Sequence, residues 1–330
     1  MAGRLDPAVA RARLLVRRSL ADLSPGDLAL VGLSGGADSL ALATATGFVA
    51  PRAGLRWGVV VVDHRLQPGS ERVAATAAAQ ASALGADPVR VERVDGTVGP
   101  LGPEGSARKA RLAALRRVAT ETEAAAVLLA HTRDDQAENV LLGLARGSGS
   151  RSLAGMAPRA GVLRRPLLDL TRAEARQVCA ASGLTPWTDP HNADPAYTRS
   201  RVRTDVLPVL EQQLGPGVAY ALARTADLLR ADADLLDRLA DELFAAVTMP
   251  GESGALDVAG LARAPGALRG RVLRAAAVEA GAPATDVTAG HVAELDRLVT
   301  DWHGQVGVDL PGRLRASRDG GTVRFTRDTS

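Results

Sequence analysis

The stretch that decides the fold is Leu28–Leu40, which reads Leu-Ala-Leu-Val-Gly-Leu-Ser-Gly-Gly-Ala-Asp-Ser-Leu. It begins with an apolar run of strand length, continues with a glycine-bearing turn, and ends in an Ala/Leu-rich segment of helical character from Asp38 onward. Gly35 and Gly36 let the backbone approach a ligand closely. The first amides of a helix lack internal acceptors and lie at the positive end of the helix dipole. We therefore expect an anion site here that suits a polyphosphate.

The same loop carries side chains suited to phosphate and metal binding. Ser34 and Ser39 supply hydroxyl donors, and Asp38 can orient a metal ion held on the phosphates. The loop is not the common Gly-Lys-Ser/Thr phosphate loop, because the only lysine of the chain is Lys109. An ordinary Gly-Gly turn before a helix is the alternative. The apolar strand directly before the loop favours the phosphate site.

The composition limits the classes of protein to which the chain can belong. Its 330 residues suit about two domains, and with 46% hydrophobic but 2% aromatic residues the core must consist mostly of Ala, Leu and Val. The formal charge of +3 is small, but nearly all cations are arginines, which favour bidentate phosphate contacts. The single cysteine, Cys179, excludes an internal disulfide framework and predicts a cytoplasmic protein. No stretch approaches the ~20 apolar residues of a membrane span, so no membrane partner is expected.

Strand and helix patterns alternate from Asp27 to Arg146. Strand-length runs occur at residues 55–62, 87–94 and 125–130, with helical patterns at 70–84 and 104–122 and a glycine-rich loop at 96–105. Nearly continuous apolar runs are typical of parallel strands covered on both faces. The fold class is therefore α/β, a doubly wound, mainly parallel sheet. Val62, Asp63 and His64 lie at the carboxyl end of a strand, where such sheets bind ligands.

The C-terminal part has a different pattern. Residues 216–244 predict one long helix, with a buried side of Leu222, Leu228, Leu229, Leu235, Leu236 and Leu239. Helical patterns near residues 265–280 and 286–302 precede alternating runs at 305–310, 313–317 and 322–325, and Asp319-Gly320-Gly321 predicts a hairpin. We therefore expect a catalytic domain over residues 1–213, a linking helix over 214–246 and a small α+β domain over 247–330.

Leu129–Gly149 is the second informative stretch. Asp134 or Asp135 can cap a new helix there, and Asp135, Glu138 and Asn139 share one face because they lie at positions i, i+3 and i+4. Two carboxylates just past the end of a strand could hold an ammonium group or a metal ion. The alternative is an acidic first turn that complements the helix dipole.

The segment after this helix is rich in arginine. Residues 146–161 predict a flexible cationic flap that contains Arg146 and Arg151, followed by a strand at 162–168 that contains Arg165. A solvated loop without function is the alternative to the flap.

Another arginine-rich stretch covers residues 187–208. Arg199, Arg201 and Arg203 alternate, so they share one strand face or one side of a loop, and either arrangement can bind phosphates. Trp187 can stack on an unpaired base, although ordinary packing is its commoner role.

In their order along the chain, these motifs resemble one family. Residues 34–39 resemble the loop of the PP-loop ATP-pyrophosphatase superfamily, whose Rossmann-like members split ATP between its α and β phosphates. The later motifs are similar to those of the tRNA(Ile)-lysidine synthases: Val-Asp-His-Arg-Leu, Glu-Gly-Ser-Ala-Arg-Lys-Ala-Arg, Ala-His-Thr-Arg-Asp-Asp-Gln-Ala-Glu, Arg-Gly-Ser-Gly, Arg-Pro-Leu-Leu and Trp-Thr-Asp-Pro-His-Asn. This resemblance runs from Leu28 to Pro208. Five positions depart from the family pattern. Thr132 stands in place of a histidine, Asn139 in place of a threonine and Leu112 in place of an aromatic residue, and His191 and Ser200 replace a serine and an asparagine.

The resemblance implies a ligase that uses ATP and free L-lysine to convert the wobble cytidine of tRNA(Ile) with a CAU anticodon into lysidine. In that reaction the base carbonyl oxygen is adenylated with loss of pyrophosphate, and AMP departs when the lysine ε-amine attacks the ring carbon. The change switches codon reading from AUG to AUA and identity from methionine to isoleucine.

The resemblance also implies roles for individual residues. The ATP phosphates are expected at Ser34, Gly35, Gly36, Ala37, Asp38 and Ser39, with Mg²⁺ held by Asp38 through the phosphates, and the adenosine at Val62, Asp63 and His64. The substrate lysine is expected at Asp135 and Glu138. Arg108, Arg111, Arg199 and Arg203 are expected to stabilise charge that develops on the transferred phosphate. With a tRNA as partner, Arg146, Arg151, Arg165 and Trp187 become the expected RNA contacts, and the small α+β domain over 247–330 is expected to bind the tRNA.

Rival functions fit the same residues less well. A tRNA thiolase with the same loop needs paired cysteines, and only Cys179 is present. Small-molecule synthetases of the superfamily lack the acidic helix and the arginine flap. A non-catalytic nucleotide sensor or RNA-binding module does not need Asp38, Asp135 and Glu138. The oligomeric state is left open, with a homodimer as one option.

Overall fold

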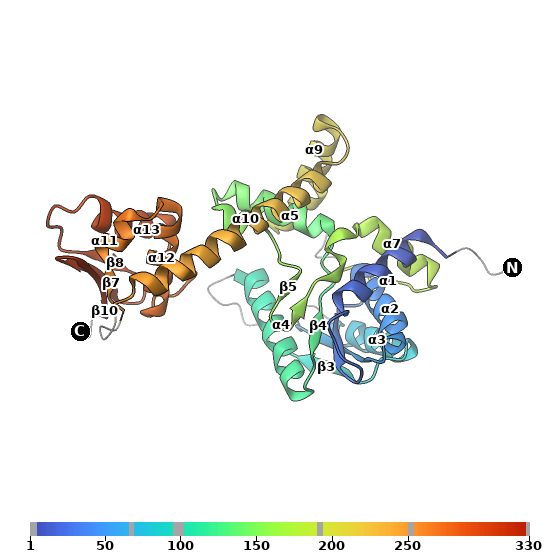
Figure 1. The fold of residues 1–330 in the computed structure, drawn as a ribbon. Helices are drawn as coiled ribbons and strands as arrows, with labels where there is room; N and C mark the ends of the chain where they lie inside the picture. Colours follow the sequence, from blue (N-terminus) through green and yellow to red (C-terminus); the bar gives the residue numbers. More distant parts are fainter. Residues whose placement is uncertain (1–4, 66–68, 95–101, 190–193, 250–253, 328–330) are drawn as a thin grey trace. The chain divides into compact units, whose positions relative to one another are not determined.

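The structure is a computed structural model that describes residues 5–65, 69–94, 102–189, 194–249 and 254–327 (Figure 1). The chain divides into two compact units, Met1–Arg230 and Ala231–Ser330. The division falls inside the long helix α10 (Val218–Val247), which covers nearly the same residues as the linking helix expected over 214–246. No helix within the described ranges is both long and apolar enough to cross a membrane.

A six-stranded sheet forms the centre of the described part of the first unit, in the order β3-β2-β1-β4-β6-β5. Its strands are β1 (Leu28–Leu33), β2 (Arg56–Asp63), β3 (Val89–Arg93), β4 (Ala126–Leu128), β5 (Arg159–Ala160) and β6 (Leu163–Arg164). All neighbouring pairs are parallel except β5 with β6. The expected mainly parallel sheet is therefore confirmed.

The strands β1, β2 and β4 bury side chains on both faces of this sheet, which explains their continuous apolar runs. The flanking helices are α1 (Pro7–Ser19), α2 (Ala37–Arg52), α3 (Ser70–Ala83), α4 (Gly102–Glu121) and α7 (Arg172–Ala181). Ala29 and Val31 join a core that contains residues of α1, α2, α3 and α7, whereas Leu28 and Leu30 join a core with residues of α4. The sheet is thus doubly wound, as expected, and β1 carries its loop from the centre of the sheet directly into α2.

Two local expectations were wrong, and a third segment contains regular elements that the sequence did not predict. The loop expected over 96–105 ends earlier, because α4 already begins at Gly102, while residues 95–101 lie outside the described part. The strand expected over 162–168 is limited to β6 and gives way to a 3-10 turn, η1 (Pro166–Asp169), since proline cannot donate to a strand ladder. The segment expected as a flexible flap over 146–161 contains the short helix α6 (Ser150–Leu153) and β5.

The alternating arginines lie on helical turns and not on a strand or loop. They occur in α8 (Thr198–Arg201) and in a π-helical turn, η3 (Val202–Val206), which leads into α9 (Leu207–Leu214). Val202 and Leu207 pack against Ala137 of α5 (Arg133–Ala145). This packing holds the turn beside α5. Arg199 and Arg203, which lie four residues apart, can therefore both contact that helix.

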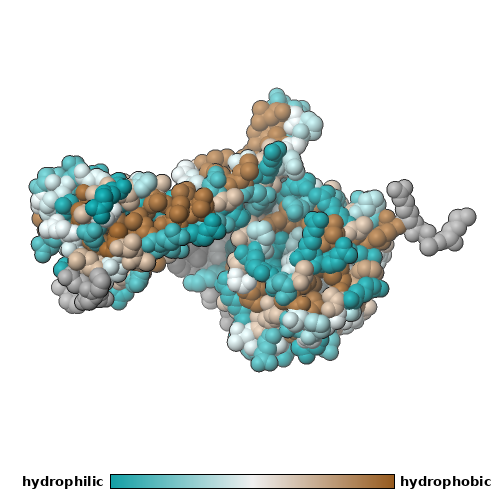
Figure 2. All heavy atoms as spheres, in the orientation of Figure 1, coloured by the Kyte–Doolittle hydropathy of each residue, from teal (hydrophilic) through white to brown (hydrophobic). Residues whose placement is uncertain are grey.

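The buried side of α10 differs from the expected leucine stripe. Ala223, Ala226 and Ala233 are buried, whereas Leu228 and Leu235 are 59% and 48% exposed. Hydrophobic side chains accordingly show along this helix in the space-filling view (Figure 2). The small alanines allow close packing on one side, and the bulkier leucines remain outside it.

The second unit is a small α+β domain, as expected. Its described elements after α10 are β7 (Leu256–Asp257), α11 (Val258–Arg263), α12 (Gly266–Glu279), α13 (Ala289–Thr300), β8 (Val308–Leu310), β9 (Leu314–Asp319) and β10 (Thr322–Arg327). The strands pair antiparallel in the order β7-β10-β9-β8. Gly320 has a φ of 55° at the expected hairpin turn between β9 and β10. The sequence patterns missed β7 and α11, which are short.

Candidate active site

The loop between β1 and α2 is closed by its own serines. The Ser34 N–H and hydroxyl both lie 3.2 Å from the Ser39 Oγ, and the Ser39 hydroxyl donates to the Gly36 carbonyl at 2.9 Å. Gly35 has a φ of 80°, which glycine adopts without strain, and Gly36 is the N-cap of α2. The loop therefore presents the amides at the start of α2 in a compact turn, the geometry expected of a phosphate site.

A cavity of about 560 Å³ lies next to this loop. Its lining brings together most of the residues expected to bind ATP, namely Ser34, Asp38, Ser39, Val62, Asp63 and His64, and adds Arg111 and Trp187. A larger cavity of about 720 Å³ is lined by residues of α1, η1 and α10 and by none of the loop residues. The smaller cavity is therefore the candidate nucleotide site, because it alone of the two adjoins the anion loop.

Two buried carboxylate oxygens in this cavity have no hydrogen-bond partner among the described residues. They are Asp38 Oδ1 and Asp63 Oδ2. Burial raises the pKa of Asp38 to about 6, and the neighbouring Asp135 adds to that shift. The other Asp63 oxygen accepts the Arg65 N–H at 3.0 Å. A cation beside Asp38 and a hydroxyl or amino donor beside Asp63 would satisfy these oxygens, so the residues fit Mg²⁺ and a nucleoside.

Metal binding by side chains alone is not indicated here. The described residues contain no group of three or more His, Cys, Asp or Glu side chains arranged around a common point. Asp38 is therefore suited to hold a metal only together with ligands from a substrate, which is how Mg²⁺ is usually bound at phosphates.

The acidic helix α5 begins differently from the expected cap. Thr132 is the N-cap, and Asp135 occupies the third helical position, where its Oδ2 accepts the Thr132 N–H at 2.8 Å and the Thr132 hydroxyl at 3.0 Å. Asp134 instead accepts the backbone N–H of Arg172 at 2.8 Å. The threonine that departs from the family pattern thus has a structural role, since it orients Asp135.

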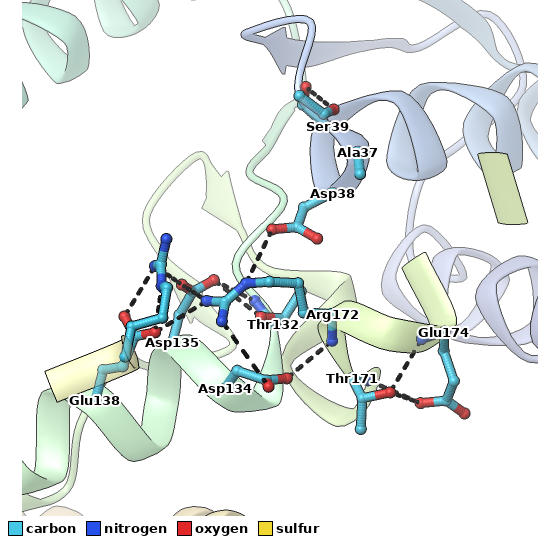
Figure 3. A network of polar contacts seen from close by, with 12 residues as sticks. Ala37, Asp38, Ser39, Thr132, Asp134, Asp135, Glu138, Thr171, Arg172 and Glu174 are labelled. Carbon is cyan, nitrogen blue, oxygen red and sulfur yellow. Dashed lines mark hydrogen bonds and ion pairs between the residues drawn. The ribbon is translucent and has the colours of Figure 1, made fainter. Parts of the chain in front are cut away.

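Asp135 and Glu138 lie on one face of α5, as their spacing predicted, but both are already bound by arginines (Figure 3). Arg172 Nη2 lies 3.0 Å from Asp135 Oδ1 and 3.0 Å from Glu138 Oε1. Arg203 donates to Glu138 through Nε at 2.8 Å and through Nη2 at 3.0 Å. The side chain of Glu138 is fully buried. The pair is therefore a charge-compensated cluster and not an open pair of carboxylates.

Arg172 was not identified from the sequence. It is the first residue of α7, and its Nε also lies 3.9 Å from Asp38 Oδ2, so that one guanidinium links the phosphate loop to the acidic helix. The Thr171-x-x-Glu174 pattern signals where α7 begins. No local pattern pairs Arg172 with Asp135 and Glu138, because these residues lie 37 and 34 positions earlier in the chain.

The four arginines expected to act on phosphate lie around the same region. Arg199 donates to the Asn139 side chain, and its Nε lies 3.6 Å from Glu138 Oε2. Burial lowers the pKa of Arg111, and the neighbouring charges of Arg108 and Arg199 lower it further. A cluster of cations that repel one another gains from an anionic ligand, which an ATP phosphate would supply.

His131, at the end of the strand before α5, also lines the candidate nucleotide site. Burial lowers its pKa well below the usual range, with Arg111 acting in the same direction and Asp135 opposing it. The imidazole is therefore neutral at physiological pH and adds no charge to the cluster.

The residues expected to contact RNA are not gathered in one place. Arg146 and Arg151 are exposed, whereas Arg165 is only 8% exposed and donates to the Ala157 carbonyl at 2.7 Å. A buried Arg165 cannot serve as a surface contact in this conformation. Trp187 lies against the phosphate loop, where its backbone N–H donates to the Gly35 carbonyl at 3.0 Å. The His-Asn part of its motif, at residues 191 and 192, lies outside the described residues.

Fold and loop define the class of protein. A family model described as a PP-loop domain matches residues 13–210, and one described as a TilS substrate binding domain matches residues 256–322. Among solved structures, U34-tRNA thiolase NcsA from Methanococcus maripaludis superposes with a TM-score of 0.57 at 19% identity, covering 68% of this chain and 80% of that one. This likeness shows the fold alone.

More similar relatives define the particular family. The tRNA(Ile)-lysidine synthase of Thermobifida fusca is 58% identical over 98% of this chain and 98% of its own length. The synthase of Leifsonia xyli is 57% identical over 92% of this chain and 91% of its own length. The synthase of Mycobacterium bovis is 46% identical over 87% of this chain and 86% of its own length. The chain belongs to the tRNA(Ile)-lysidine synthase family, which confirms the family and the enzyme class expected from its motifs.

Proposed function

We propose that this chain ligates free L-lysine to the wobble cytidine of tRNA(Ile) with a CAU anticodon and consumes ATP to AMP and pyrophosphate. The observation that carries the proposal is the placement of the phosphate loop, a nucleoside-sized cavity and a buried carboxylate pair next to one another. The loop and the cavity suit ATP, and the carboxylates suit a cationic amino acid.

The phosphate loop would hold the triphosphate. Amides at Gly36 and Ala37 and the hydroxyl of Ser34 donate to phosphate oxygens, and Asp38 holds Mg²⁺ together with those oxygens. Bound Mg²⁺ neutralises charge on the phosphates and makes pyrophosphate a better leaving group. The free Asp63 oxygen accepts a donor from the nucleoside.

The basic residues would act during transfer of the adenylyl group to the cytidine carbonyl oxygen. Arg111 lines the nucleotide cavity, and Arg108 and Arg199 lie near enough to lower its pKa. Guanidinium groups placed in this way stabilise negative charge as it develops on the transferred phosphate. Adenylation makes the base oxygen a leaving group, so the lysine ε-amine can replace it at the ring carbon.

The lysine substrate would bind at Asp135 and Glu138. Carboxylates are the natural partners of an ammonium group. The guanidinium of Arg172 contacts both carboxylates of this pair and also Asp38. Because their oxygens already accept hydrogen bonds from Arg172 and Arg203, the substrate must replace at least one of these donors.

The tRNA would reach the site with its target base turned out of the anticodon loop, because the reacting carbonyl must enter the cavity. Exposed Trp187 lies at the cavity beside the phosphate loop, where an unpaired base can stack on it. Arg146 and Arg151 are accessible for contacts with the RNA backbone.

The test is incorporation of labelled lysine by the purified chain with ATP, Mg²⁺ and a transcript of tRNA(Ile) carrying the CAU anticodon. We expect lysine in the RNA and matching amounts of AMP and pyrophosphate. The transcript of elongator methionine tRNA, which has the same anticodon, is the matched control. Equal labelling of both transcripts would refute the tRNA specificity, and pyrophosphate release without labelling would refute the ligation.

A further inference from the structure

Two arginines from different elements bind the same oxygens of the acidic pair. Arg172 Nη2 lies 3.0 Å from Asp135 Oδ1 and 3.0 Å from Glu138 Oε1. Arg203 Nε lies 2.8 Å from that Glu138 oxygen, and its Nη2 lies 3.4 Å from that Asp135 oxygen. A third cation is more distant, since Arg199 Nε lies 3.6 Å from Glu138 Oε2. An incoming ammonium group therefore meets a position that is already occupied by a cation.

Arg172 is the more firmly held of the two. Its guanidinium lies within 4.0 Å of four carboxylates, because it also reaches Asp38 and Asp134 at 3.9 Å (Figure 3). Its backbone N–H donates to Asp134 at 2.8 Å. Departure of this side chain would leave carboxylates of both α2 and α5 without their shared cation, which is costly for buried charges.

Arg203 makes fewer such contacts. Among the described residues its ion pairs are with Asp135 and Glu138 only, and 23% of its side chain is exposed against 16% for Arg172. It belongs to the π-helical turn η3, an uncommon backbone arrangement that recurs at functional sites. Val202 and Leu207 anchor the backbone on either side. Rotation of the Arg203 side chain would thus vacate the acidic pair without moving the turn.

We propose that the two arginines have separate tasks at the lysine site, an inference that rests on the proposed function. Arg172 is a positioning residue and the permanent counter-ion that holds Asp135 and Glu138 in place. The Arg203 guanidinium occupies, in the ligand-free enzyme, the position that the substrate ammonium takes. Exchange of one cation for another keeps buried Glu138 compensated throughout, and it frees Arg203 to turn toward the phosphates.

The two arginines should therefore affect lysine binding in opposite directions. Without Arg203 the ammonium position is open, so lysine binds without displacing a side chain. Without Arg172 the remaining Arg203 must compensate Asp135 and Glu138 almost alone, so its displacement becomes harder. A purely structural role predicts instead that loss of either arginine weakens binding.

The experiment is a calorimetric titration of the full-length chain with L-lysine. We expect Arg203→Gln to tighten lysine binding by about tenfold and Arg172→Gln to weaken it by about tenfold, the value of one charge-assisted contact. Arg172→Lys keeps the cation and should restore affinity to within about threefold of the unchanged chain. Changes of the same sign in both glutamine variants, or no change in either, would overturn the proposal.

Arg133→Gln is the matched control. Arg133 Nη2 donates to the Asp169 carbonyl at 2.6 Å, so this arginine joins α5 to the segment before α7 without touching the acidic pair. Its loss should change lysine affinity by less than about twofold. If Arg172→Gln fails to fold, as judged by its thermal transition, the comparison of Arg172→Lys with Arg203→Gln tests the proposal instead. The proposal is contradicted if Arg172→Lys is no more stable than Arg133→Gln and yet its affinity for lysine falls by more than about tenfold.

Lysine incorporation by the unchanged chain separates this inference from the proposed function. If that chain incorporates lysine into tRNA but the two glutamine variants do not change lysine affinity in opposite directions, the inference alone fails. If the unchanged chain neither binds nor incorporates lysine, the proposed function fails and the inference fails with it.

Discussion

At the scale of single residues, the site contains charges that are held at a cost to stability. Asp38 is the clearest case, because burial raises its pKa from 3.8 to about 6 and one of its oxygens has no partner among the described residues. An acid whose pKa is raised on folding lowers stability when ionised. The penalty is absent below the unfolded pKa and is complete once the pH has risen through the folded pKa.

Asp38→Asn should therefore stabilise the nucleotide-free chain while removing its activity. At pH 8 we expect the free energy of unfolding to rise by about 2 kcal/mol, with little gain at about pH 3, below the unfolded pKa, where the aspartate is mostly protonated in both states. Turnover should fall by about 100-fold or more because the proposed Mg²⁺ site loses its side-chain ligand. Urea denaturation at the two pH values and the lysine-incorporation assay measure these effects. Equal stabilisation at both pH values would contradict the buried-charge explanation.

Glu138 should matter for lysine more than for ATP. Glu138→Gln keeps the size of this fully buried side chain but removes the charge that faces Arg172 and Arg203 and that we propose binds the substrate ammonium. We expect the KM for lysine to rise by about tenfold or more and the KM for ATP to change by less than about threefold. Steady-state kinetics with each substrate varied in turn measures both. An unchanged lysine dependence would remove Glu138 from the lysine site.

At the scale of elements, the start of α7 positions the arginine of the cluster. Thr171 caps this helix by accepting the Glu174 N–H at 3.1 Å, and Glu174 accepts the Thr171 N–H at 2.7 Å and hydroxyl at 2.8 Å. These bonds and Arg11 lower the pKa of Glu174 against the opposing effect of its partial burial. Arg172 follows the cap directly, so the direction of its side chain depends on where the helix begins.

Thr171→Ala should weaken both the helix start and the site. We expect a loss of about 1 kcal/mol in stability and a rise of several-fold in the KM for lysine. Thr288→Ala is the matched control, because Thr288 caps α13 of the second unit in a capping box with His291. That variant should lose similar stability and keep its KM for lysine. Kinetics and thermal unfolding of the two variants side by side test the difference, and an equal rise in KM would contradict it.

At the scale of the whole molecule, the two units have separate hydrophobic cores. The cores around the large sheet contain residues up to 222, whereas the core of the second unit begins with Ala240 on α10 and includes Leu256, Leu273 and Leu295. The proposed ATP site lies entirely in the first unit. Separate cores generally unfold as separate cooperative units.

Scanning calorimetry should therefore resolve two unfolding transitions. ATP with Mg²⁺ at about 100 times its dissociation constant should raise only the transition of the first unit, by a free energy of about 2.7 kcal/mol. Thr288→Ala should lower only the other transition. A single transition that shifts as a whole with ATP would show that the units unfold together.

Local patterns in the sequence were sufficient to predict the fold class, the phosphate loop and the family of this protein. The run that leads into Ser34–Ser39 determined the loop and its place between a strand and a helix, because a strand, a glycine turn and a helix start are read from adjacent residues. The i, i+3 spacing of Asp135 and Glu138 placed both on one face, because helix geometry determines it. The order of the motifs was enough to indicate the family.

The tertiary structure alone decided how the charges are compensated. Arg172 meets Asp38, Asp135 and Glu138 only because α7 and α5 begin beside α2 in the fold, and no local pattern encodes contacts between residues more than 30 positions apart. The same reason explains why the acidic pair, which was expected to bind an ammonium group or a metal, is occupied by arginines, and why Arg165, which was expected to contact RNA, is buried. Buried charges must find partners wherever the packed chain brings them, and that depends on the assembled fold.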